Sequence, residues 1–146
     1  MRRAARRCRA GLIRIKAGRP ALWSYMFGNL NMENMMSYKD TLATLKPQVK
    51  SFNTAIGDTA RGFGAIAASL HGDGALSHQH KECVALGIAV AIRCEPCILL
   101  HTEALIRMGT TREVIAEVLA VAVEMGGGPA VMYGARALAA YDELSG

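Results

Sequence analysis

Three of the four cysteines lie within the twenty residues from Glu82 to His101, together with a histidine and an acid that directly precedes an apolar run. Cys94 and Cys97 form a C-x-x-C motif, and His101 follows four residues after the second thiol. Glu82 precedes the first thiol by twelve residues. Two thiols at this spacing can form and break a disulfide, and an imidazole with a carboxylate can move the protons that this chemistry needs. The grouping therefore indicates thiol redox chemistry.

The start of a helix is expected at the cysteine pair. Proline is tolerated in the first turn of a helix and disfavoured inside one, so Pro96 predicts a helix that begins at Cys94 or Glu95. Thiols in that turn lie at the positive end of the helix dipole, which stabilises a thiolate. Cys97 and His101 are four residues apart, so a sulfur and an imidazole share one face of this helix.

The carboxylate belongs to the preceding helix. Spacing alone does not place Glu82, but an antiparallel helix pair that opens at Arg93 would return it to the thiols. An acid at the start of an apolar run is destabilising unless it has a partner. We therefore expect Glu82 to form a proton relay with His101.

Other interpretations of the same residues stay open at this point. The C-x-x-C could be two packed thiols or a passive disulfide, His101 a core or surface histidine, and Glu82 a capping acid. The C-x2-C-x3-H spacing could also bind zinc if Glu82, His78 or His80 supplied the fourth ligand. Cys83, in an apolar run, is expected to be a buried and inert thiol.

The beginning of the chain differs from the remainder. Eight of the 17 basic residues lie in the first 19 positions, and no acid occurs before Glu33. Such a segment can be a transit peptide, a poorly ordered arm or translated sequence upstream of a later start, and the last two are favoured. From Met32 onward the net charge is −3, without the basic stripe that nucleic-acid binding needs. We divide the chain into a leader, residues 1–36, and one domain, residues 37–146.

Helical periodicity dominates the domain, and no convincing alternating β pattern occurs. Only 5% of the residues are aromatic, whereas aliphatic residues are abundant, which favours helices packed on helices. Ser37 with Asp40, and Thr110 with Glu113, have capping-box spacing. We expect an all-α bundle of about six helices with the C-x-x-C at the start of a central helix. The first predicted helix starts at residue 37. The other five cover about residues 54–70, 78–92, 94–108, 111–125 and 129–144.

The number of cysteines and the length of the apolar runs indicate the cellular compartment and whether the chain spans a membrane. Four cysteines in 146 residues do not make a disulfide scaffold, which fits a reducing, cytoplasmic compartment. The longest uninterrupted apolar run, residues 83–92, is about half of what a bilayer requires, so no membrane span is expected. The helix over 78–92 is apolar nearly all round, which predicts burial on several sides.

The combined pattern resembles a known family. E-x11-C-x2-C-x3-H, starting at Glu82, resembles the signature of the AhpD-like alkylhydroperoxidase group within the carboxymuconolactone decarboxylase superfamily. The segment EMGGGPAVMYGARALAAYDEL, residues 124–144, is similar to the C-terminal helix of its small single-domain members. The resemblance covers about residues 38–144.

This resemblance implies a dithiol–disulfide cycle that reduces hydroperoxides, in an all-helical protein that assembles into trimers or hexamers. It implies that Cys97 attacks, that Cys94 resolves, and that His101 and Glu82 move the proton, partly through water. The best-studied members carry a histidine where Pro96 stands here, so a simpler relay is expected. The expected partners are a hydroperoxide, a dithiol reductant and further copies of the chain, with no cofactor, metal, nucleic acid or membrane.

Two further functions compete with this one. The protein could be a non-enzymatic oligomeric helical protein, such as a redox sensor whose dithiol only switches state. The decarboxylase branch of the superfamily shares the fold but generally lacks the cysteine pair, which disfavours lactone decarboxylation here.

Overall fold

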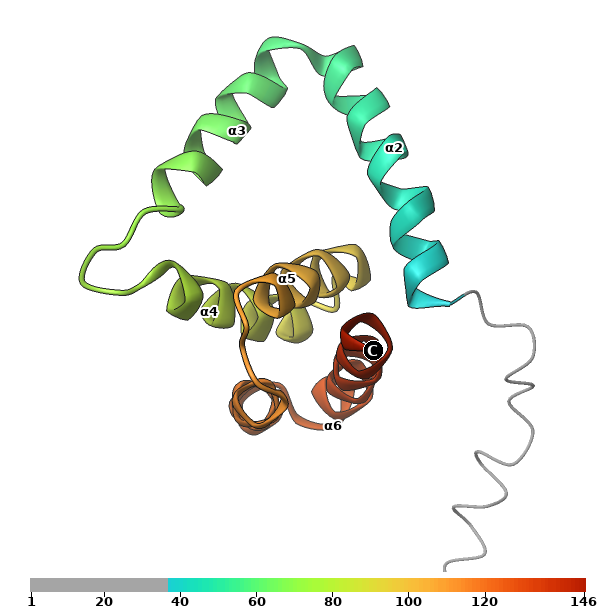
Figure 1. Ribbon diagram of the computed structural model, residues 1–146, viewed down its shortest axis with the longest axis vertical. Helices are drawn as coiled ribbons and strands as arrows, with labels where there is room; N and C mark the ends of the chain where they lie inside the picture. Colours follow the sequence, from blue (N-terminus) through green and yellow to red (C-terminus); the bar gives the residue numbers. More distant parts are fainter. Residues whose placement is uncertain (1–36) are drawn as a thin grey trace, which may run out of the picture. The chain divides into compact units, whose positions relative to one another are not determined.

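The computed structural model describes residues 37–146, which form helices and no strand (Figure 1). The elements of this part of the chain are α2 (Tyr38–Ile56), α3 (Asp58–Leu70), α4 (His78–Ala91), α5 (Glu95–Arg107) and α6 (Arg112–Ser145). The predicted all-α fold, with the C-x-x-C at the start of one of its helices, is confirmed. The interpretation of residues 1–36 as a basic leader lies outside the described residues.

Helices α4, α5 and α6 pack on one another around the main hydrophobic core. Leu86 of α4, Leu105 of α5 and Ile115 of α6 are fully buried in it. Burying one such side chain contributes about 1.5–3 kcal/mol. This packing holds α4 and α5 against each other, as the expected carboxylate–imidazole contact requires.

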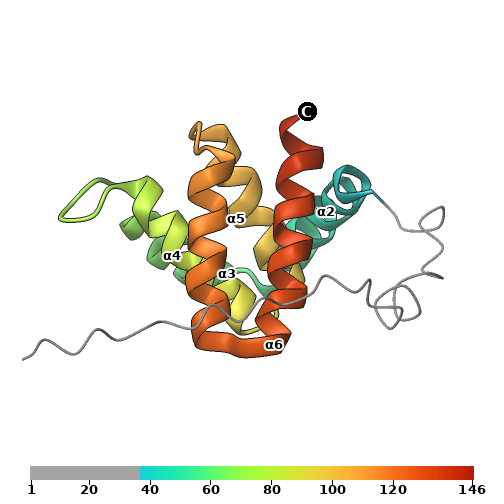
Figure 2. The ribbon, with the colours of Figure 1, turned by 90° about the horizontal axis from the view of Figure 1, so that it is seen from below.

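The element α6 reverses direction at Gly127. Gly127 has φ 61° and ψ −150°, a conformation that is essentially restricted to glycine. At Gly126 a Cβ atom would lie 2.8 Å from the Cβ of Ala130, so a side chain has no room there. The two helical arms lie side by side in Figure 2, and Arg112 near one end forms two hydrogen bonds with Asp142 near the other. The arms correspond to the two helices predicted on either side of the glycine run.

Among residues 37–146, α6 is long and apolar enough, by length and composition, to cross a membrane. Core helices of globular proteins meet the same criteria. The reversal at Gly127 divides α6, and Leu119 and Ala137 from its two arms lie in the core. We therefore describe α6 as a core element.

The first two helices meet at a position that the sequence pattern missed. Ser37 caps α2 as predicted, because its Oγ accepts a hydrogen bond of 3.0 Å from the Asp40 amide. Pro47 does not divide α2, which continues to residue 56. The break falls at Gly57, with φ 48°, so the prediction of a continuous helix from about residue 54 is wrong at its start.

The junction between α5 and α6 also differs from the prediction. Thr110 is not the helix cap but a buried side chain that accepts a hydrogen bond of 2.7 Å from Gln79 Nε2. Its carbonyl oxygen accepts a bond from the hydroxyl of Tyr141, and Thr111 occupies the cap position. Gly109 has φ 72°, in the left-handed position at which a glycine commonly ends a helix.

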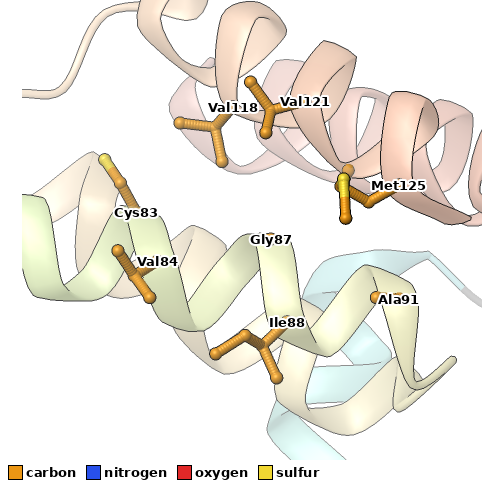
Figure 3. A pocket seen from close by; sticks show the side chains of 9 residues that line it. Cys83, Val84, Gly87, Ile88, Ala91, Val118, Val121 and Met125 are labelled. Carbon is orange, nitrogen blue, oxygen red and sulfur yellow. The ribbon is translucent and has the colours of Figure 1, made fainter.

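Helix α4 is buried on fewer sides than its sequence predicts. Leu86 and Val90 are fully buried, whereas Val84 and Ile88 are 55% and 54% exposed. The exposed side borders a groove between α4 and α6 (Figure 3). The apolar residues of α4 therefore form two surfaces: one is buried in the core, and the other is exposed beside the groove.

Candidate active site

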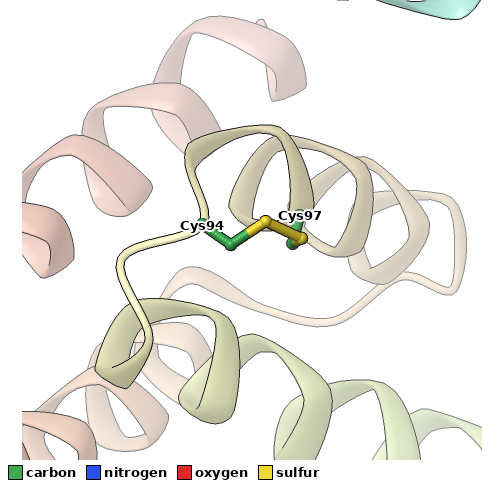
Figure 4. Close-up of a disulfide and its surroundings, with 2 residues drawn as sticks. All are labelled: Cys94 and Cys97. Carbon is green, nitrogen blue, oxygen red and sulfur yellow. A yellow bond between two sulfur atoms is a disulfide. The ribbon is translucent and has the colours of Figure 1, made fainter. Parts of the chain in front are cut away.

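A disulfide joins Cys94 and Cys97, whose Cα atoms are 5.3 Å apart (Figure 4). Cys94 is the N-cap residue of α5, and Cys97 lies in its first turn, with Pro96 between them. The helix dipole is positive at this end and stabilises the thiolate that reduction of the disulfide releases. The two sulfurs therefore meet where the sequence places the start of the helix.

The turn before the cysteines is a Schellman motif, in which two amides close the end of α4. The Cys94 amide donates to the Ala89 carbonyl at 3.0 Å, and the Arg93 amide donates to the Val90 carbonyl at 3.2 Å. Arg93 takes the left-handed position with φ 62°, where glycine is usual. Gly109 takes the equivalent position at the end of α5. The backbone that presents Cys94 is thus strained at one residue.

Arg93→Gly is expected to stabilise the protein by about 1 kcal/mol, because a left-handed residue with a Cβ costs roughly 1–2 kcal/mol and glycine recovers most of it. Thermal unfolding should show a melting temperature a few degrees higher than that of the unchanged protein. Arg93→Ala keeps the Cβ and is the matched control, with little change expected. A lower melting temperature for Arg93→Gly would show that the arginine side chain contributes more than the strain removes.

Glu82 of α4 meets His101 of α5 across the helix pair. A hydrogen bond of 2.7 Å joins Glu82 Oε2 and His101 Nδ1, and the Glu82 side chain is only 14% exposed. His101 lies one turn after Cys97 and on the same face of α5. The structure therefore brings the carboxylate and the imidazole together one helical turn from Cys97, and it leaves Nε2 of His101 as the ring nitrogen that does not bind Glu82.

A second histidine flanks the same carboxylate. His78 Nε2 lies 3.5 Å from Glu82 Oε1, is buried, and has no hydrogen-bond partner. Its ring stacks on His71 with centroids 4.9 Å apart. A cavity of about 260 Å³, lined in part by these three residues and Arg107, adjoins them. His78 was predicted only as a possible zinc ligand, although its spacing of four from Glu82 favours this contact.

The other histidine considered for zinc points elsewhere. His80 Nδ1 lies 2.7 Å from Ser77 Oγ at the start of α4. Within the described range, 37–146, no group of three or more His, Cys, Asp or Glu side chains is arranged to hold a metal ion. The zinc hypothesis therefore finds no ligand set in this part of the chain.

Cys83 is half-buried and lines the groove between α4 and α6. Burial raises the pKa of its thiol, and the neighbouring charge of Glu82 raises it further. A protonated thiol is a poor nucleophile. Cys83 is thus more exposed than predicted, but its environment makes it less reactive than an ordinary cysteine.

Alkylation of Cys83 by iodoacetamide is expected to be slow in the folded protein at neutral pH. Because the pKa is raised, the thiolate forms at a higher pH than in the unfolded chain, and each pH unit of delay lowers the rate about tenfold. Mass mapping of alkylated peptides between pH 7 and pH 10, with and without urea, measures the difference. Equal rates in folded and unfolded protein would contradict the assignment.

Comparisons with known proteins give the family. The family model described as carboxymuconolactone decarboxylase family matches residues 57–140. The chain is similar to the apo crystal structure of a carboxymuconolactone decarboxylase family protein from Legionella pneumophila, with a TM-score of 0.71 and 37% identity over 75% of this chain and 97% of that one. An uncharacterized protein of Cupriavidus necator is 38% identical over 108 residues, 69% of this chain and 96% of its own length. Uncharacterized protein 4 in the cox locus of Paracoccus denitrificans is 35% identical over 101 residues, 64% of this chain and 91% of its own length.

This chain belongs to the carboxymuconolactone decarboxylase family. The predicted resemblance to the AhpD-like group is confirmed at the level of this superfamily. The family includes both AhpD-like peroxidases and decarboxylases, so the choice between the two reactions depends on the site.

Proposed function

We propose that the protein is a thiol-dependent peroxidase or disulfide reductase of the AhpD-like type. The observation that carries this proposal is the Cys94–Cys97 disulfide at the start of α5, one helical turn before His101, which is hydrogen-bonded to Glu82. A reversible pair of this kind accepts electrons from a dithiol and passes them to an oxidant. The two thiols also argue against lactone decarboxylation, which needs no such pair.

The proposed catalytic cycle consists of three steps: attack on the peroxide, formation of the disulfide, and reduction of the disulfide. The Cys97 thiolate attacks one peroxide oxygen, the O–O bond breaks, and the product alkoxide takes up a proton and leaves as an alcohol. Cys94 then attacks the sulfenic acid on Cys97, so that a disulfide forms and water leaves. A dithiol reductant returns two electrons and two protons to the pair and is itself oxidised to a disulfide.

The assignment of roles follows from the helix geometry. His101 shares a face of α5 with Cys97, so its free Nε2 is directed to the attacking thiol in our proposal. Glu82 binds Nδ1 at 2.7 Å, which fixes the orientation of the ring. Pro96 supplies no imidazole between the sulfurs, so Glu82 and His101 form the relay. A reducing, cytoplasmic compartment would keep such a pair cycling.

Hydroperoxide consumption with a dithiol such as dihydrolipoamide tests the proposal. We expect many turnovers per protein molecule and a Cys94–Cys97 bond that mass mapping finds after peroxide and loses after the dithiol. A single stoichiometric oxidation without cycling would contradict the peroxidase and support a redox sensor instead. Absence of any oxidation of the pair would contradict both.

A further inference from the structure

The carboxylate of Glu82 lies between two imidazoles. Its Oε2 atom lies 2.7 Å from Nδ1 of His101, and its Oε1 atom lies 3.5 Å from Nε2 of His78. The two histidines belong to different helices, since His78 is the first residue of α4 and His101 lies in α5. Each oxygen of the carboxylate therefore faces a different ring, whereas the relay proposed above uses only the contact with His101.

The Nε2 atom of His78 is buried and has no hydrogen-bond partner among residues 37–146. A buried polar atom without a partner destabilises a fold, so such an atom calls for an explanation. At 3.5 Å, Glu82 Oε1 lies a few tenths of an ångström beyond the usual range of a hydrogen bond. Hydrogen bonds in catalytic sites are often long before substrate binds and shorten afterwards. A small movement of either side chain therefore closes this contact.

Two contacts hold His78 in place without the help of Glu82. Its amide donates a hydrogen bond of 2.8 Å to Asp73 Oδ1, which fixes the backbone at the start of α4. Its ring stacks on the ring of His71, with centroids 4.9 Å apart and 29° between the planes. Both partners belong to the segment between α3 and α4. The ring of His78 is thus held from outside the candidate site, as a residue that positions another side chain must be.

We propose that His78 is a positioning residue, which donates a hydrogen bond from Nε2 to Glu82 Oε1 and so keeps Oε2 directed at His101. This inference rests on the proposed function, because it assigns a role within the same relay. The last side-chain torsion of a glutamate has broad minima, so without this donor the carboxylate turns more freely. A proton passes between Nδ1 and Oε2 only while the two atoms are within hydrogen-bond distance.

Two amide substitutions that differ in reach test this role. The side-chain nitrogen of glutamine is as many bonds from the backbone as Nε2, whereas that of asparagine is one bond closer and matches Nδ1. His78→Asn should therefore lower kcat/KM for the hydroperoxide about tenfold, since a misplacement of about 1 Å costs up to about 100-fold. His78→Gln should keep most of the activity, because it keeps the donor in place.

His80→Gln is the matched control, because His80 lies in the same helix but its ring contacts Ser77 Oγ, at 2.7 Å. It should leave kcat/KM nearly unchanged, and circular dichroism checks that every variant keeps its helices. Equal activity of His78→Asn and the unchanged protein would overturn the proposal. Equal losses in His78→Asn and His78→Gln would overturn it as well, since the reach of the donor would then not matter.

A double variant separates positioning from a general effect on the fold. If His78 acts only through the carboxylate, His78→Asn should cause no further loss of kcat/KM in a chain that already carries Glu82→Gln. A full second loss, equal to that of His78→Asn alone, would show that His78 acts by another route and would contradict the proposal.

Long-range ¹H–¹⁵N NMR measures the contact without turnover, because it shows which ring nitrogen of a neutral histidine carries the proton. We expect the proton of His78 on Nε2, with a signal that shifts in Glu82→Gln while that of His80 does not. A bare Nε2, or a signal that ignores Glu82→Gln, would contradict the positioning role. Absence of turnover in the unchanged protein, together with the expected NMR signals, would instead contradict the proposed function and support the contact between His78 and Glu82.

Discussion

Cys97→Ser is expected to reduce hydroperoxide turnover to the background rate, a loss of about 10⁴-fold or more for removal of a nucleophile. A serine hydroxyl forms no appreciable alkoxide at neutral pH and gives no sulfenic acid, so the first bond to oxygen is not made. Cys94→Ser should behave differently, because Cys97 can still attack once. We expect it to consume about one equivalent of peroxide and to form a sulfenic acid that dimedone traps.

The two serine variants control for each other, since each replaces one sulfur by oxygen in the same turn of α5. Steady-state turnover, dimedone labelling and mass mapping of both measure the expected contrast. Undiminished turnover by Cys97→Ser would end the peroxidase proposal. Trapping of a sulfenic acid at Cys94 in Cys97→Ser, with none in Cys94→Ser, would exchange the two roles.

Glu82→Gln is expected to lower kcat/KM for the hydroperoxide about 100-fold, the scale of a positioned acid–base group. The amide has nearly the shape of the carboxylate and can still contact His101, but it cannot accept and return a proton as the proposed relay requires. His101→Gln should cause a loss of similar size. Because the two residues act as one unit, the double variant should lose little more than either single one.

Glu103→Gln is a matched control for this series. Glu103 lies on α5 and pairs with Lys46, at 2.6 Å, rather than with the candidate site. Its replacement should leave kcat/KM within about twofold, because a partly exposed ion pair contributes little. Losses that add fully in the double variant of Glu82 and His101 would show that the two residues act separately and would contradict the relay.

The cysteine site was largely predictable because its determinants are local. Pro96 restricts where a helix can begin, and a spacing of four places Cys97 and His101 on one face whatever surrounds the helix. The contact of Glu82 with His101 was an inference from topology, since it depends on how α4 and α5 pack. The hydrogen bond of 2.7 Å between them shows that the turn at Arg93 reverses the chain as expected.

Other features depended on tertiary structure and were missed. The strained backbone of Arg93 leaves no signal in a sequence, because glycine is the usual residue in that position. Thr110 has the spacing of a helix cap, but its hydroxyl oxygen accepts a hydrogen bond from Gln79, which lies 31 residues away in the chain. Helical periodicity places Phe63 and Ile66 on one side of a helix, but it does not show that both side chains are exposed.

The short span of the disulfide has a consequence for how oxidation and folding are related. Only three positions separate Cys94 from Cys97, so the closed ring restricts little of the unfolded polypeptide, about 2 kcal/mol by chain entropy. The core of α4, α5 and α6 is built mainly from aliphatic side chains, and Cys97 only packs against it. We therefore expect the domain to stay assembled when the bond opens, as the repeated oxidation and reduction of the pair in the proposed function requires.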